Sequence, residues 1–174
     1  MADLSKPLRI MKRILILLLA LMVSSCATYV TSLKGNYVPY VEMASTIPFD
    51  ELWDNAIDAF VYNEIPIRTI DKESGLLVSD VFVSNKTTIE KDGKAKNNDM
   101  WYVVPNYYGE FASDADRQYY VSAQLIIRIR ERKEDDVCTL HIGLTNMQCT
   151  VSTTKLQVKS TGTLEKSLLM SIAQ

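Results

Sequence analysis

The stretch YYVSAQLIIRIRERKEDDVCTLHIGLTNM, residues 119–147, decides the fold. Its first half alternates apolar and polar side chains with a period of two, which is typical of a strand with one buried face. An acidic run at 134–136 interrupts the alternation, and the second half then resumes it. The sequence therefore predicts an antiparallel hairpin of two long strands, 119–131 and 137–147, with His141 on the polar face.

The clearest helix of the sequence begins after Pro48. Apolar residues recur there at helical spacing and form one face: Leu52, Trp53, Ala56, Ile57 and Phe60. The opposite face carries an acidic stripe, which is typical of a solvated helix surface. A weaker pattern of the same kind, after Gly162 and Thr163, predicts a short amphipathic helix over 164–173.

Shorter segments complete the predicted sheet. They are a strand at 37–43, a hairpin of 65–70 and 76–83 around a turn at 71–75, a short strand at 101–104 and an edge strand within 149–159. The polar stretch 84–100 predicts a loop. Because no strand–helix–strand repetition requires a parallel sheet, we predict an α+β fold. It consists of an antiparallel β-sheet of about five strands, one main amphipathic helix packed across it, and a short C-terminal helix.

The N-terminal segment has the pattern of an export signal. A basic pair at 12–13 precedes an apolar run at 14–23, which is about half the length that a membrane-spanning helix needs. The run ends in Val23, Ser24, Ser25 and Cys26, which resembles the lipobox of bacterial lipoproteins. The resemblance implies cleavage between Ser25 and Cys26, and acyl chains on Cys26 that hold the mature chain on a membrane.

The same resemblance implies how the chain is divided into segments and where in the cell it is located. Residues 1–25 are predicted to be the signal peptide, with Met11 as the natural start, so that residues 1–10 are a misassigned extension. Residues 26–36 form a lipidated tether, and 37–174 form a single α+β domain. Because Ala27, and not aspartate, follows the cysteine, the resemblance implies the outer membrane, with the domain facing the periplasm.

A second resemblance concerns the segment around the helix. The sequence from Pro48 through Trp53 to Ile57, followed by Ile67 and the turn DKESG at 71–75, is similar to the helix-grip modules of BamC-like (NlpB-like) lipoproteins. The chain has one such module where BamC has two. The resemblance implies a lipid-tethered accessory domain of the cell envelope, and it implies no catalytic residues.

The charge and the cysteine residues limit which partners and which cross-links are expected. The mature chain has 15 basic and 20 acidic residues, so nucleic acid is not an expected partner. Cys138 and Cys149 would lie about 36 Å apart on one extended strand, whereas a disulfide needs Cα atoms within about 7 Å. Only a turn near 143–146 would bring them together. We therefore interpret both as small buried hydrophobic residues.

The sequence offers little catalytic chemistry. His141 is the single histidine, and no nucleophile elbow, phosphate-binding glycine loop or metal-ligand motif accompanies it. We predict a non-enzymatic protein without a catalytic residue, a cofactor or a metal. A hydrolase that uses His141 with an acid is the disfavoured alternative.

Two candidate binding surfaces remain. The first is aromatic, with side chains that suit a recognition surface or else pad the core under a long loop: Trp101, Tyr102, Tyr107, Tyr108 and Phe111. The second is a row of three arginines, which would meet anionic headgroups or an acidic partner, or else lie solvated beside Glu134 and Asp135: Arg128, Arg130 and Arg132. We predict an accessory or scaffold subunit that binds another envelope protein. The alternative is a glycan- or peptidoglycan-binding lipoprotein that uses the aromatic stretch 101–120.

Overall fold

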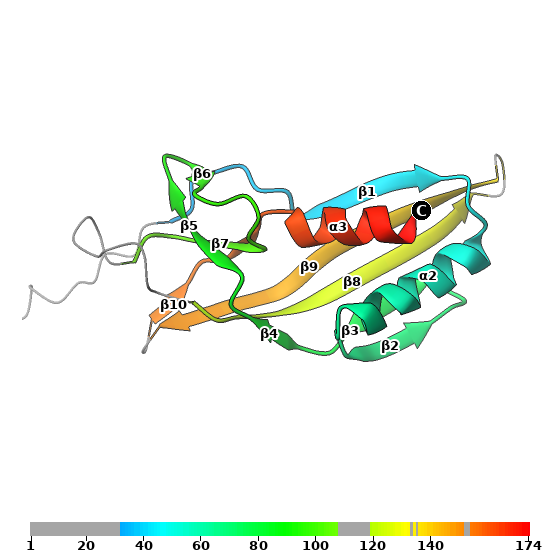
Figure 1. The fold of residues 1–174 in the computed structure, drawn as a ribbon, viewed down its shortest axis with the longest axis horizontal. Coiled ribbons are helices and arrows are strands. Elements are labelled where there is room, and N and C mark those ends of the chain that lie inside the picture. The colour runs from blue at the N-terminus through cyan, green and yellow to red at the C-terminus, as the bar shows by residue number, and fades with distance from the viewer. Residues whose placement is uncertain (1–31, 108–118, 133, 135, 152–153) are drawn as a thin grey trace, which may run out of the picture.

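The computed structural model describes residues 32–107, 119–132, 134, 136–151 and 154–174. In this part of the chain, eleven strands and two helices follow one another (Figure 1). The strands are β1 (Tyr40–Ser45), β2 (Ile67–Asp71), β3 (Leu76–Ser79), β4 (Phe82–Ser84), β5 (Thr87–Lys91), β6 (Lys94–Ala95), β7 (Tyr102–Val104), β8 (Val121–Arg132), β9 (Val137–Val151), β10 (Thr154–Leu156) and β11 (Lys159–Ser160). The helices are α2 (Phe49–Tyr62) and α3 (Thr163–Ile172).

The strands form two sheets. The larger has seven strands, all antiparallel, in the order β1-β9-β8-β3-β2, with β10 paired to β9 and β4 paired to β8. The smaller has four strands in the order β11-β7-β5-β6, and its β5 and β7 run parallel. We call them the large sheet and the small sheet.

This architecture corrects the predicted fold class. The described chain is mostly β, and the expectation of an α+β domain with a single sheet of about five strands under one main helix is wrong. The predicted loop 84–100 holds β5 and β6, and the predicted edge strand 149–159 divides between the two sheets. Only β7 of the small sheet falls wholly in a predicted strand, at 101–104, because its other strands have two to five residues and lack a clear period of two.

The hairpin of β8 and β9 forms the backbone of the large sheet. Its helix-facing residues are buried, among them Leu125, Ile127 and Ile129 on β8 and Leu140 and Ile142 on β9. The strand β8 ends at Arg132, one residue beyond its predicted end, and β9 runs four residues further than predicted, to Val151. Each extension adds ladder hydrogen bonds, which favour strand over loop wherever a partner lies alongside.

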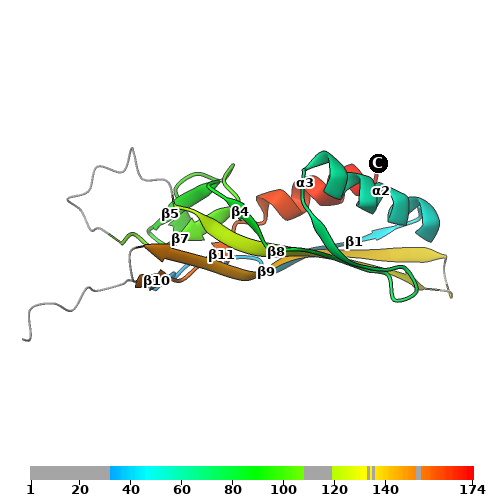
Figure 2. The ribbon, with the colours of Figure 1, turned by 90° about the horizontal axis from the view of Figure 1, so that it is seen from below.

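Both helices pack against the same face of the large sheet. The helix α2 contacts α3 and β8, while α3 contacts β1 and β9. Figure 2 shows the helices and the small sheet on one side of the long strands. The molecule therefore has two layers, and the other face of the large sheet carries no layer from the described chain.

The covered face is an apolar core. The helix α2 contributes Leu52, Trp53, Ala56, Ala59 and Phe60, all buried. Its N-terminal turn also carries Asp50 and Glu51, whose negative charges suit the positive end of the helix dipole. Burial of this face, and not intrinsic helix propensity, holds a helix of this length.

The cysteines behave as the spacing predicted. Cys138 and Cys149 both lie on β9, both are buried, and both are free thiols. Burial raises the pKa of each thiol, first and mainly through loss of solvation. They therefore remain protonated and serve as small core residues.

Candidate functional site

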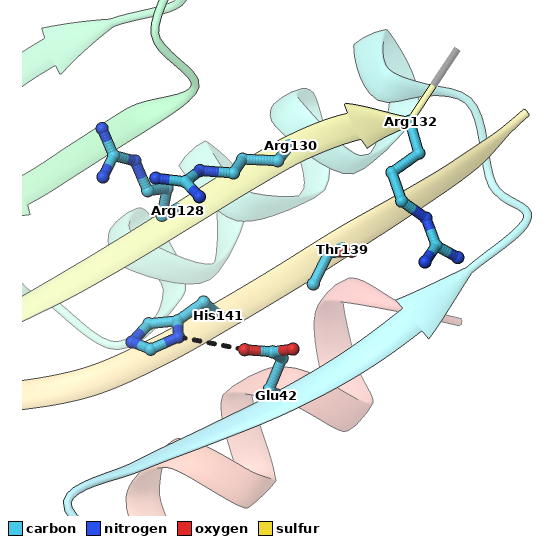
Figure 3. Close-up of a pocket in the computed structure, with 6 residues that line it drawn as sticks. All are labelled: Glu42, Arg128, Arg130, Arg132, Thr139 and His141. Carbon is cyan, nitrogen blue, oxygen red and sulfur yellow. Dashed lines mark hydrogen bonds and ion pairs between the residues drawn. The ribbon is translucent and has the colours of Figure 1, made fainter. Parts of the chain in front are cut away.

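A hollow of about 480 Å³ lies on the uncovered face of the large sheet. Six residues line it, and we call them the arginine groove: Glu42, Arg128, Arg130, Arg132, Thr139 and His141 (Figure 3). Figure 3 shows Arg132 extending across β9 towards β1, while Arg128 and Arg130 lie together over β8. The groove thus spans three neighbouring strands at the end of the molecule farthest from the small sheet (Figure 1).

Strand alternation and register explain why these side chains meet. On β8, the arginines occupy every second position, so all three point away from the helices. Across the hairpin, Arg128 lies opposite His141 and Arg130 opposite Thr139. On the next strand, Glu42 lies opposite His141. Directly opposed residues have Cβ atoms about 5 Å apart, which is close enough for one ligand to contact several of them.

His141 is held by two neighbours. Its Nδ1 lies 3.5 Å from Oε2 of Glu42, and its ring stacks on Tyr40 with centroids 4.3 Å apart. Figure 3 marks the contact with Glu42. The prediction that His141 lies on the polar face is confirmed. The arrangement orients the imidazole across the groove, where it can donate a hydrogen bond to an acceptor.

The groove is lined by three arginines and one carboxylate, so its charge is positive. Among the described residues, neither Arg128 nor Arg130 forms a salt bridge, and Glu134 is therefore not their partner. The Nε atom of Arg128 is buried without a hydrogen-bond acceptor in the described chain. The one carboxylate that lines the groove, Glu42, lies beside His141. Buried polar groups normally have partners, so this N–H is free to donate to an acceptor that enters the groove.

A second, smaller hollow of about 360 Å³ adjoins the groove and shares Arg130 with it. It follows the turn at 71–75, where Asp71 accepts hydrogen bonds from the backbone and hydroxyl of Ser74. These bonds, with a minor contribution from the charge of Arg128, lower the pKa of Asp71. Gly75 has φ +65°, and a Cβ there would lie 1.9 Å from the carbonyl oxygen of Ile129. Only glycine fits this turn.

The predicted aromatic surface is only partly described. Tyr102 is fully buried between the layers, so it is a core residue and not part of a binding platform. Trp101 is half-buried beneath the ammonium group of Lys86, which lies 4.2 Å from the ring centroid. Tyr107 is half-buried and its hydroxyl lies 3.2 Å from that of Thr154. Tyr108 and Phe111 lie outside the described residues.

The predicted lipidation site, Cys26, and its neighbour Ser25 also lie outside the described residues. In the ranges that the structure describes, no helix is long and apolar enough to cross a membrane. Within the same ranges, no three histidine, cysteine, aspartate or glutamate side chains lie close enough to share a metal ion.

Two groove residues, Glu42 and Thr139, were not singled out from the sequence. Both fall in predicted strands, at polar positions of the alternation. Their place in the groove depends on β1 pairing with β9, a contact between residues about 100 positions apart. A local pattern contains no information on which strand becomes the neighbour of which.

Fold and groove together define a class: a two-layer, mostly β domain with one open, arginine-rich sheet face. No family model matches the chain, and no curated protein does. Among solved structures, the chain is similar to a DUF4468 family protein from Bacteroides ovatus ATCC 8483, with a TM-score of 0.34 and 13% sequence identity. The alignment covers 73% of this chain and 66% of that one, so just under two thirds of the other protein is matched. Such a likeness assigns neither fold nor function.

Proposed function

We propose that this chain is a lipid-anchored, non-enzymatic envelope protein that binds an acidic segment of another envelope protein in the arginine groove. The observation that carries the proposal is the uncovered face of the large sheet, on which Arg128, Arg130 and Arg132 line one hollow. Arginine is enriched where proteins bind one another, and its planar group pairs with a carboxylate through two hydrogen bonds.

The spacing of the groove suits an extended acidic peptide. Alternate residues of a strand lie roughly 6.6 Å apart, and the side chains on one side of an extended peptide repeat at the same distance. Carboxylates at every second position of such a peptide would therefore match the three arginines one to one. The Thr139 hydroxyl and the His141 ring add further hydrogen-bonding groups to the groove.

Lipid anchoring is supported by the lipobox residues Val23, Ser24, Ser25 and Cys26. Its test is the intact mass of the protein purified from membranes. A mature chain that begins at Cys26 and carries the mass of a diacylglyceryl group and a further acyl chain is the expected result. An unmodified chain, or one that begins elsewhere, removes this half of the proposal.

The groove is tested by site-specific photocrosslinking in intact envelopes. A photoreactive residue in place of Thr139 is expected to capture one defined protein through an acidic segment. The same residue in place of Asp58, on the exposed face of α2, is the matched control and should not capture it. Changing all three arginines to Gln should abolish the adduct, whereas Arg→Lys should retain part of it because the charge persists without the bidentate geometry.

A purified probe gives the same test without the envelope. Poly-glutamate should bind the wild-type protein at low ionic strength and at least tenfold more weakly after Arg128→Gln with Arg130→Gln, since each desolvated charge pair contributes on the order of 1.4 kcal/mol or more. Equal binding by the two proteins, together with identical adducts from positions 139 and 58, would remove the groove from the proposal.

A further inference from the structure

The chain just before β1 is fastened to the small sheet by one carboxylate. Glu90 on β5 accepts hydrogen bonds from the backbone N–H groups of Lys34 (2.9 Å) and Gly35 (2.5 Å), and from the hydroxyl of Tyr37 (3.0 Å). Leu33 is buried, and its N–H donates to the side chain of Gln157 at 2.8 Å. The small sheet is therefore the place where the predicted tether joins the domain.

Lysines surround this junction. Lys91 and Lys94 lie directly opposite each other where β5 turns into β6, and like charges in that position repel. The turn between them touches residues 34–37, which we call the fastened segment, because a Cβ at Gly35 would lie 2.3 Å from the carbonyl oxygen of Gly93. We call the group at this junction the lysine end: Lys34, Lys91, Lys94 and Lys159.

The lysine end carries an excess of positive charge. Among the described residues, none of its four lysines forms a salt bridge. Glu90 accepts three hydrogen bonds from residues 34–37, and its charge also interacts with that of Lys159. Residues 32–39, 86–104 and 157–162 together carry six lysines and three acidic residues, although the mature chain as a whole is acidic. Positive charge is therefore concentrated where the tether leaves the domain.

The tether is short compared with the domain. Cys26 and Leu33 are seven Cα–Cα steps apart, and even a fully extended segment of this length spans at most about 25 Å. The strand β8 alone rises about 36 Å from Val121, near the small sheet, to Arg132. Figure 1 shows the small sheet at one end of the molecule, and the end of β8 and the start of β9 at the other. An anchor at Cys26 therefore keeps the lysine end, and not the arginine groove, near the membrane.

We infer that the lysine end rests on the anionic headgroups of the membrane that holds the anchor, so that the arginine groove points away from that membrane. The inference rests on the lipid anchoring of the proposed function. Each lysine near an anionic lipid surface favours contact by a factor of about five, and acyl chains with a basic patch are a known pairing of membrane signals.

The experiment uses the acylated protein in two kinds of vesicle, one of pure phosphatidylcholine and one that also contains phosphatidylglycerol. Lysine acetylation by a water-soluble reagent is followed residue by residue with mass spectrometry. Acetylation of Lys34, Lys91 and Lys94 should slow about fivefold on the anionic vesicles. Lys72, which pairs with Asp50 at 2.8 Å beside α2, should react equally on both. Added salt should remove the difference.

Two variants make the outcome decisive. Lys91→Gln with Lys94→Gln should abolish the protection of Lys34, whereas Arg130→Gln with Arg132→Gln should leave it intact. Equal acetylation of all lysines on both vesicles would overturn the inference, as would protection of Lys72 that depends on the arginines, because the open face would then lie on the membrane. The intact mass of the sample tests the lipid anchor separately, because an unacylated protein would refute the anchor itself. A failure to find a partner for the arginine groove would refute the proposed binding but not this orientation on the membrane.

Discussion

The two faces of the large sheet are made from alternate residues of the same strands, yet they meet different surroundings. On β8, Leu125, Ile127 and Ile129 are buried beneath the helices, while Arg128 and Arg130 line an open groove one residue away. The difference shows that strand alternation assigns side chains to faces, while the packing of other elements decides which face is closed. The stability of the protein should reside in the covered face, and its binding in the open one.

The largest effect is expected from a cavity in the covered face. Phe60 of α2 is fully buried, and Phe60→Ala should lower the free energy of unfolding by about 3–5 kcal/mol. Urea denaturation followed by circular dichroism measures this change. Its neighbour Val61 is 69% exposed, so Val61→Ala is the control and should change stability by less than about 0.5 kcal/mol. Similar losses in both variants would mean that α2 is not packed as described.

A smaller effect is expected where the covered layer departs from apolar packing. Glu165 of α3 is fully buried, and neither of its carboxylate oxygens has a hydrogen-bond partner of good geometry in the described chain. Burial raises the pKa of Glu165 above its ordinary value, against the opposing influence of the Ser160 hydroxyl, a backbone amide and Lys166. The charge of Glu165 also adds to the effect of burial in raising the pKa of Tyr102.

Because the folded pKa of Glu165 is raised, its contribution to stability is present below the ordinary carboxyl pKa and is lost as the pH rises through the folded pKa. Glu165→Gln should therefore stabilise the protein at neutral pH by about 1–3 kcal/mol and have little effect in acid. The measurement is the melting temperature as a function of pH, with Asp54→Asn on the exposed side of α2 as the control. A Gln variant that is less stable at neutral pH would contradict this account.

Glu90 is the contrasting carboxylate, since its partners are in place. Burial by itself would raise the pKa of Glu90, but the hydrogen bonds from Lys34, Gly35 and Tyr37 outweigh it, and the pKa lies below its ordinary value. Its stabilising contribution is thus present above the ordinary carboxyl pKa and is lost as the pH falls through the folded pKa. Glu90→Gln should cost about 1 kcal/mol at neutral pH and less in acid.

A second readout is specific to this junction. Loss of solvation, with the hydrogen bond to Glu90 and its charge, raises the pKa of Tyr37 to about 12. Absorbance titration of Glu90→Gln should show this tyrosine titrating closer to its ordinary value. Asp92→Asn, in the exposed turn after β5, is the control. An unchanged tyrosine titration in Glu90→Gln would show that the fastened segment is not held as described.

The smallest effect on stability is expected on the open face. Arg130 is exposed and forms no salt bridge with a described residue, so Arg130→Gln should change the free energy of unfolding by less than about 0.5 kcal/mol. Binding of poly-glutamate, in contrast, should weaken severalfold. A destabilisation comparable to that of Phe60→Ala would show that Arg130 stabilises the fold, and the two faces would then not differ in their contribution to stability.

The sequence by itself determined the elements whose patterns are long. The hairpin of β8 and β9, the helix α2, the position of His141 on the polar face and the free thiols of Cys138 and Cys149 follow from local periodicity and from distance along one strand. Periodicity identifies such elements because ten or more residues repeat the same constraint. The lipobox and the BamC-like segment remain predictions from residue patterns alone.

Only the tertiary structure decided the rest. It showed that the predicted loop 84–100 pairs into a second sheet, that Glu42 comes to lie beside His141, and that Tyr102 and Glu165 are buried between layers. Each of these facts depends on contacts between segments far apart in the chain, and such contacts cannot be predicted from the pattern of neighbouring residues. Strand order and layer packing are properties of the whole fold, since they are chosen by the total burial and hydrogen bonding that one arrangement achieves over others.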